Sequence, residues 1–261
     1  MMEMRKNMHY EQYGQSENPV ILLLHGGGFS IWNYRKAAEL LCNEYRVILP
    51  YLDGHAGSED PFESIETCAK HVIDLIDEQF NGQVLLLGGL SLGAQTVAEM
   101  LAKRNDIARY ALLESASVIA DPLTGSLVGP TFSASYGLVK SRRFAKMQFD
   151  YYRLDQEYFE EYYRDTCAVS KQNLTAFTKA SALYEAKEEI RNTQAKTMII
   201  AGSKETKIIL RSAQKLHEMI ADSELIIKEG MYHGQLSMNH PQEYVNMIKD
   251  LLQKWDLTQS K

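Results

Sequence analysis

Short apolar runs alternate with amphipathic helical stretches along most of the chain, and this alternation constrains the fold more than any other feature. Val20–Leu24 and Gln83–Leu87 have the length of buried strands, whereas Ile65–Gln79 carries its apolar residues on one side at helical spacing. Strands that alternate with helices form βαβ units around a parallel sheet. The chain is therefore predicted to be an α/β protein with a mostly parallel sheet flanked by helices. Strands are expected at 20–24, 46–49, 83–87, 110–113, 196–201 and 224–228.

The alternation is interrupted once, between about Asp121 and Ile190. This stretch has no strand-like run, is helical in composition and is rich in aromatic residues. We predict an insertion of several helices at 121–190 within a core formed by 1–120 and 191–261. Its aromatic side chains could line an apolar pocket, although most are expected to pack the inserted helices against one another.

Composition excludes several classes of function. The 28 basic and 34 acidic residues give a net charge of 28 − 34 = −6, which offers no electrostatic basis for binding nucleic acid or an anionic membrane. The longest early apolar run is far shorter than the ~20 residues of a membrane span, and no signal peptide is recognisable. We therefore expect a cytoplasmic protein. No metal-binding spacing links its three cysteines, Cys42, Cys68 and Cys167, and we expect neither a metal nor a cofactor.

A candidate nucleophile follows the strand at 83–87. Residues 89–93 read Gly-Leu-Ser-Leu-Gly, which matches G-x-S-x-G, and a predicted helix begins directly after Ser91. A sharp strand-to-helix turn strains the serine backbone and exposes its hydroxyl above the carboxyl end of the strand. The start of the helix also offers N–H groups to a developing negative charge. Ser91 is the predicted nucleophile.

A second glycine-rich turn, His25-Gly26-Gly27-Gly28, ends the first predicted strand. Glycines leave the backbone N–H groups of such a turn unobstructed. One of these groups, together with the N–H of Leu92, could form an oxyanion hole for a tetrahedral intermediate.

A serine hydroxyl needs a general base, and seven histidines are available. His233 lies in a loop just past the last predicted strand, at the same sheet edge as Ser91, and is the predicted base. His55, in the loop Asp53-Gly54-His55-Ala56-Gly57, is an outside candidate.

The base in turn needs an acid that holds its tautomer. Glu205 is the only carboxylate in the loop after the strand at 196–201 and is favoured, although an acid at the start of a helix is common. Glu114 directly follows the strand at 110–113 and is a rival.

Together these segments resemble the α/β-hydrolase superfamily over about residues 9–255. The resemblance rests on LLLHGGGFS, PYLDGHAGS, GLSLG, AGSKET and GMYHG, in the order of the family. It implies a roughly eight-stranded sheet with a helical cap inserted after the sixth strand. It also assigns the oxyanion N–H groups to Gly27 and Leu92 and orders the triad as Ser91, Glu205 and His233. Two departures are a glutamate where the family usually has aspartate and a short N-terminal segment before the first core strand.

The resemblance implies a serine hydrolase that cleaves a small, partly apolar carboxylic ester through an acyl-enzyme. Lactone, thioester or carbon–carbon cleavage on the same fold is an alternative. A ligand-binding or receptor-like protein with slow turnover is another. The sequence does not identify the oligomeric state.

Overall fold

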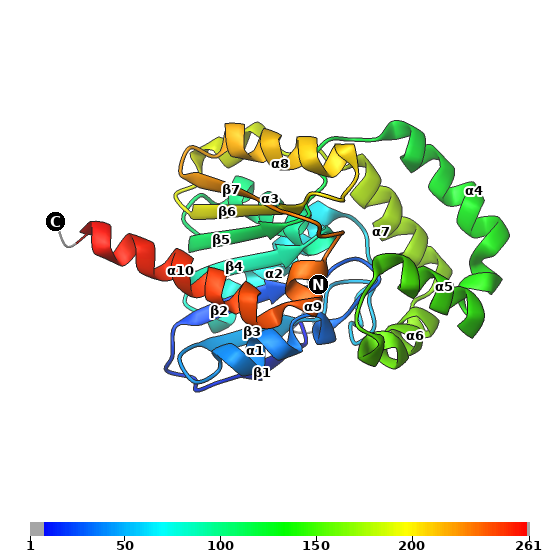
Figure 1. The fold of residues 1–261 in the computed structure, drawn as a ribbon, viewed down its shortest axis with the longest axis horizontal. Coiled ribbons are helices and arrows are strands. Elements are labelled where there is room, and N and C mark those ends of the chain that lie inside the picture. The colour runs from blue at the N-terminus through cyan, green and yellow to red at the C-terminus, as the bar shows by residue number, and fades with distance from the viewer. Residues whose placement is uncertain (1–7, 260–261) are drawn as a thin grey trace, which may run out of the picture.

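The structure is a computed structural model that describes residues 8–259, apart from the side chains of 132–135 and 254–259. Seven strands form one sheet in the order β1-β3-β2-β4-β5-β6-β7. All neighbouring strands are parallel except β1 and β3, which confirms the predicted mostly parallel α/β fold (Figure 1). The strands are β1 Tyr10–Tyr13, β2 Val20–Leu24, β3 Arg46–Pro50, β4 Val84–Leu90, β5 Ala108–Glu114, β6 Lys196–Gly202 and β7 Ser223–Lys228.

The expected strand count needs a correction. The described part of the chain has seven strands and not about eight, because a single antiparallel strand, β1, precedes β2. For the same reason the inserted helices follow the fifth strand of this chain and not a sixth.

Side chains of the central strands point alternately into two cores, because successive residues of a strand face opposite sides of the sheet. Leu22 and Leu24 of β2 enter one core, and Ile21 and Leu23 enter the other. The first core is covered by α2 Ile65–Gln79, α3 Leu92–Lys103 and α8 Lys207–Met219. The second is covered by α1 Arg35–Leu41, preceded by the 3-10 turn η1 Ile31–Asn33, and by α10 Pro241–Gln259.

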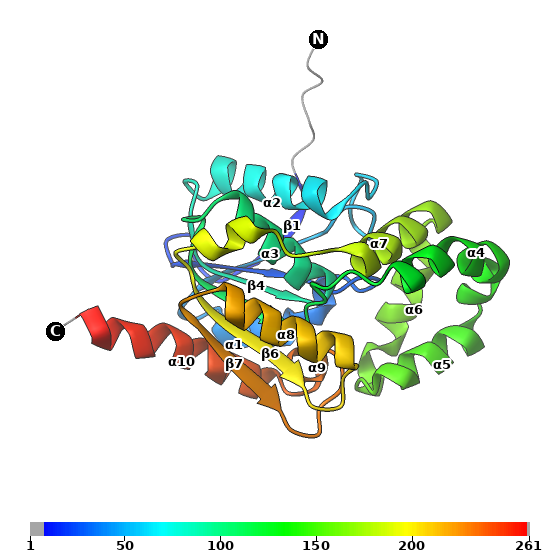
Figure 2. The same ribbon diagram turned by 90° about the horizontal axis from the view of Figure 1, so that it is seen from above.

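The inserted segment 121–190 lies beyond the end of the sheet toward which β6 and β7 point (Figure 2). Its main helices are α4 Pro122–Val139, α5 Arg142–Tyr152, α6 Phe159–Ala168 and α7 Lys171–Leu183, with 3-10 turns η2 Gln156–Tyr158 and η3 Glu188–Asn192. Many of its aromatic side chains pack among themselves, as expected: Phe149 contacts both Phe159 and Tyr162. Whether this segment acts as a separate cap stays a prediction.

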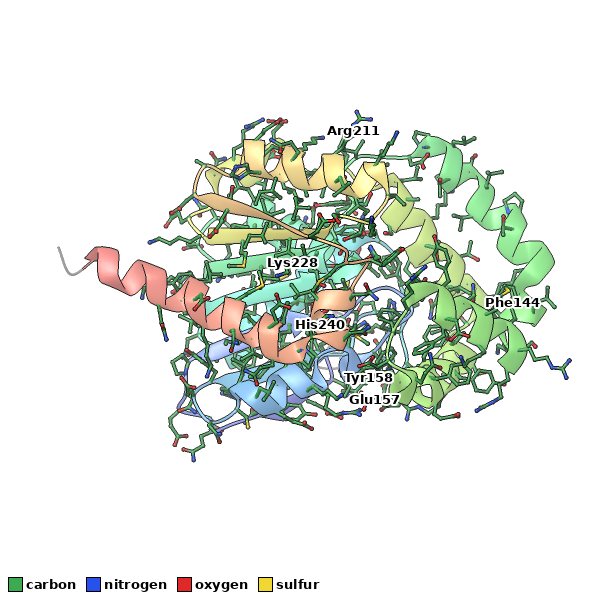
Figure 3. The ribbon with its side chains drawn as sticks, viewed as in Figure 1. Phe144, Glu157, Tyr158, Arg211, Lys228 and His240 are labelled. Carbon is green, nitrogen blue, oxygen red and sulfur yellow. The ribbon has the colours of Figure 1, made fainter. Side chains whose placement is uncertain are left out.

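The inserted segment is fastened to the core near α1. The indole N–H of Trp32 donates to Asp165 Oδ2 at 2.8 Å, and the ring of Trp32 stacks on Tyr158. Lys36 pairs with Glu157 at 2.5 Å. Figure 3 labels Glu157 and Tyr158 at this junction, where the green inserted helices meet the blue N-terminal part of the core. No helix of the described residues has the length and apolarity needed to cross a bilayer.

Candidate active site

Ser91 occupies the turn between β4 and α3. Its backbone has φ 53° and ψ −113°, a region that a residue with a side chain enters only at a cost in free energy. Two hydrogen bonds hold the turn: the Ser91 N–H donates to the carbonyl of Glu114, and the Ser91 carbonyl accepts from the N–H of Gln95, both at 2.9 Å. The strained strand–turn–helix context expected from the sequence is therefore present.

The two glycines of the G-x-S-x-G motif are required by close packing. A Cβ at Gly89 would lie 2.4 Å from the carbonyl carbon of Gly93. A Cβ at Gly93 would lie 2.1 Å from the carbonyl oxygen of Leu24. Both separations are too short for real atoms, so any larger residue would force the turn to move.

Gly27 and Leu92, the predicted oxyanion pair, lie against each other. A Cβ on Gly27 would sit 3.4 Å from the Cβ of Leu92. Leu92 is the first residue of α3, where a backbone N–H has no acceptor within its own helix. The neighbouring turn is fixed, because Gly26 donates its N–H to Asn33 Oδ1 at 3.0 Å.

His233 and Glu205 are joined by a hydrogen bond. His233 Nδ1 lies 2.7 Å from Glu205 Oε2, so the ring donates its Nδ1 proton to the carboxylate and its Nε2 is left as the basic nitrogen. The carboxylate is 1% exposed and the imidazole 32% exposed. One face of the pair is thus anchored in protein and the other is open to a substrate.

Glu205 is further held through its second oxygen. Oε1 accepts from the Gly202 N–H and from the Ser115 hydroxyl, each at 2.8 Å. Burial by itself would raise the pKa of Glu205, but the hydrogen bond and charge of His233 and the two further donors outweigh it, so that the pKa lies below its usual value. Glu205 is therefore an ionised, fully engaged partner for the imidazole.

Glu114, the rival acid, makes no hydrogen bond to His233. Its Oε1 accepts from the Ser237 N–H at 3.2 Å, and its buried Oε2 makes no hydrogen bond. The side chain is 2% exposed, and burial raises its pKa to about 7. Of the two glutamates considered from the sequence, the structure pairs Glu205 with the histidine.

Ser91 and His233 are brought to the same edge but are not hydrogen-bonded. The loop of His233 packs on the residue before Ser91, since a Cβ at Gly234 would lie 3.1 Å from the Leu90 side chain. Within residues 8–259 the Ser91 hydroxyl makes no hydrogen bond to the imidazole. Catalytic hydrogen bonds are often long in ligand-free enzymes and tighten when substrate binds.

His55, the outside candidate for the base, is committed to structure. Its ring is 3% exposed, stacks on Phe177 with centroids 4.4 Å apart, and bonds through Nδ1 to the Asp53 carbonyl at 2.9 Å. Burial lowers its pKa to about 4, so it stays neutral. His25 is likewise buried, and its Nε2 accepts from the Leu52 N–H at 3.2 Å, which ties two loops together.

Ser115 is a site residue that the sequence did not reveal. It follows β5 in a left-handed conformation with φ 57°, and its N–H donates to the Ile200 carbonyl at 2.8 Å. This turn directs the hydroxyl to Glu205. The only available signal was a serine directly after the strand that ends at Glu114.

A cavity of about 650 Å³ opens on this pair from the side of the inserted helices. Its walls include Glu205 and His233 from the core and Tyr151, Tyr152 and Arg153 from the end of α5. A smaller cavity of about 170 Å³ lies between Gly27 and the inserted helices, and Tyr152 borders both. The volume of the larger cavity suits a small organic molecule.

One group of described residues could offer three ligand atoms to a cation. Asp53, Asp60 and His71 place such atoms within 4.8 Å of one another. His71 Nδ1 already pairs with Asp53 Oδ2 at 2.6 Å, which accounts for their proximity. We therefore assign no metal to this group.

Comparison with known proteins places this geometry in context. The sequence profile of the alpha/beta hydrolase family matches residues 21–247. No curated protein sequence matches the chain significantly.

Solved structures share the fold at low sequence identity. An esterase from Thermogutta terrifontis is 18% identical, with a TM-score of 0.78, and the alignment covers 95% of this chain and 93% of that one. An enol-lactonase from Burkholderia xenovorans is 17% identical, with a TM-score of 0.80 and coverage of 94% and 96%. A meta-cleavage product hydrolase from Pseudomonas fluorescens is 18% identical, with a TM-score of 0.77 and coverage of 95% and 94%. At these identities the likeness concerns the fold.

Proposed function

Because the chain belongs to the alpha/beta hydrolase family, we propose that it is a serine hydrolase that cleaves a small carboxylic ester through an acyl-enzyme. The observation that carries the proposal is the His233–Glu205 hydrogen bond at the sheet edge where the strained Ser91 turn lies. A base oriented by a buried carboxylate, at the same sheet edge as a strand-end serine, is the arrangement that activates a hydroxyl nucleophile.

In the proposed reaction the Ser91 oxygen attacks the ester carbonyl carbon while its proton passes to His233 Nε2. The negative charge on the carbonyl oxygen is stabilised by the N–H groups of Gly27 and Leu92. The intermediate then collapses, the bond to the alcohol breaks, and His233 gives its proton to the departing oxygen. Water attacks the acyl-enzyme with the same histidine as base, which releases the acid and restores Ser91. Glu205 stays ionised throughout and stabilises the imidazolium.

Covalent labelling tests the nucleophile. A neutral fluorophosphonate should add one phosphonyl group to the folded protein, and peptide mapping should place it on Ser91. Ser91→Ala should remain unlabelled, as should wild-type protein unfolded beforehand. Absence of an adduct on folded wild type would overturn the proposal.

The bond cleaved is tested by a panel of matched ester, lactone and thioester substrates. The proposal expects the highest kcat/KM for an ester. The enol-lactonase and meta-cleavage hydrolase neighbours make lactone and carbon–carbon cleavage the alternatives to include. Rapid multiple turnover would exclude a slow, receptor-like role, whereas a single acylation without release would support it.

A further inference from the structure

The larger cavity beside His233 is unevenly charged. Four charged side chains other than the histidine line it: Asp150, Arg153, Lys204 and Glu205. Both acids are already engaged, since Asp150 pairs with Lys146 at 2.5 Å and Glu205 binds His233. Neither cation has a carboxylate partner among the described side chains. The cavity therefore presents two cations that have no ion-pair partner among the described residues, in the same lining as the proposed base.

Arg153 is held in place by the core. It is a non-glycine residue in the left-handed conformation, φ 55°, at the end of α5. Its carbonyl accepts from the side-chain amides of Gln235 and Asn239, at 3.1 and 2.9 Å. A residue with a side chain stays in this conformation only where its surroundings impose it, and such residues cluster at ligand-binding sites.

The guanidinium of Arg153 is positioned as well as the backbone. Its central carbon lies 4.2 Å from the centroid of the Tyr232 ring, and Tyr232 immediately precedes His233. The backbone N–H of Tyr232 donates to Gln235 Oε1 at 2.8 Å, and the same Gln235 side chain binds the Arg153 carbonyl. The side-chain amide of Gln235 thus connects the backbone of Arg153 to the loop that carries the proposed base. A guanidinium stacked on a ring keeps its N–H edge available to a ligand.

Lys204 approaches from the other side of the same loop. It directly precedes Glu205, and its backbone N–H donates to the Met231 carbonyl at 3.0 Å. The two cations thus come from segments that flank residues 231–233. Between them the walls are largely apolar, formed by Tyr151, Tyr152 and Ile209.

We propose that this cavity selects an anionic substrate, namely an ester that carries a free carboxylate on a short apolar chain, with Arg153 and Lys204 as specificity-determining residues. The inference rests on the proposed function, because the cavity is taken to hold part of the substrate cleaved at Ser91. The Arg153 guanidinium matches a carboxylate in two parallel hydrogen bonds, and Lys204 adds a point charge. The volume of about 650 Å³ limits the ligand to a small molecule.

The test compares charged esters with neutral counterparts of the same shape. The mono-4-nitrophenyl ester of glutaric acid carries its carboxylate on the acyl side, and its methyl-capped form is neutral. 4-Acetoxybenzoate carries the carboxylate on the alcohol side, and its methyl ester is neutral. We expect wild type to prefer the anion by at least about tenfold in kcat/KM in one of the two pairs. The pair that shows the preference identifies the side that enters the cavity.

Substitutions test whether Arg153 and Lys204 cause the preference for the anionic ester. Arg153→Asn keeps a residue that tolerates the left-handed conformation. It should lower the ratio of anionic to neutral kcat/KM at least about tenfold, mostly through KM for the anion. Lys204→Met should lower the ratio less, and Arg153→Lys should retain part of it. The matched control is Arg142→Ala, which removes a cation of the inserted helices that pairs with Glu160 and does not line the cavity.

Two outcomes overturn the inference: no preference for the anion in wild type, or an unchanged preference in Arg153→Asn/Lys204→Met. Calorimetry with Ser91→Ala protein and monomethyl glutarate separates this failure from failure of the proposed function. Arg153-dependent binding there with no fluorophosphonate adduct on wild type would reject the hydrolase and keep the anion site. An adduct on Ser91 without Arg153-dependent binding would keep the hydrolase and reject the anion site.

Discussion

The ends of β5 and β6, two adjacent parallel strands, offer a direct comparison, because β5 ends at Glu114 and β6 is followed closely by Glu205 at the same sheet edge. Glu205 gives one carboxylate oxygen to His233 and the other to two donors. Glu114 has a single backbone donor, and one of its oxygens has no hydrogen bond. The first environment stabilises the charged form and the second disfavours it. The two residues are of the same type, so the difference comes from their hydrogen-bond partners. Glu205 is suited to orient a base, whereas Glu114 is suited to stay protonated.

The largest effect should come from removing the charge of Glu205. Glu205→Gln keeps the shape of the side chain but can no longer stabilise the imidazolium, so we expect kcat to fall about 10³–10⁴-fold. Steady-state kinetics on the best ester of the panel would measure this. Glu114→Gln is the matched control and should leave kcat far closer to wild type. An equal loss in both variants would contradict the different roles of the two glutamates.

The second effect concerns stability and pH. The pKa of Glu114 is about 7 in the folded protein against 4.5 as its ordinary value, so between these pH values only the unfolded chain releases the proton. Stability should therefore fall as pH rises from about 4.5 to above 7, by on the order of 3 kcal/mol.

Glu114→Gln has no proton to lose and should remove this decline while retaining an acceptor for the Ser237 N–H. Urea unfolding of both proteins at pH 5 and pH 8 would measure it, with the exposed Glu229→Gln as control. A difference between Glu114→Gln and wild type that is the same at both pH values would show that burial does not hold the proton on Glu114.

The smallest effect should come from Ser115→Ala, which removes one of the donors to Glu205 Oε1. A hydrogen bond to a charged group contributes about 1.5–3 kcal/mol, and the Gly202 N–H remains as a donor. We expect kcat/KM to fall about tenfold. An unchanged kcat/KM in Ser115→Ala would mean that the Gly202 N–H is enough to hold the carboxylate.

The parallel α/β fold, the strained turn at Ser91 and the position of His233 at the same edge could be predicted from the sequence. These follow from local pattern: strand and helix periodicities differ, glycines mark the turn, and loops after parallel strands share one edge. The resemblance implied about eight strands, whereas the described residues have seven, because only one strand, β1, precedes β2.

The choice of the glutamate that pairs with the histidine could not be predicted and follows from the three-dimensional arrangement. Both glutamates lie at the carboxyl ends of neighbouring strands, so sequence position cannot distinguish them. The pairing depends on which side chain comes within hydrogen-bond distance of His233. The same holds for Ser115 and Arg153. Each takes a left-handed conformation that the sequence does not favour, and partners distant in the chain hold it there: Ile200 for Ser115, Gln235 and Asn239 for Arg153.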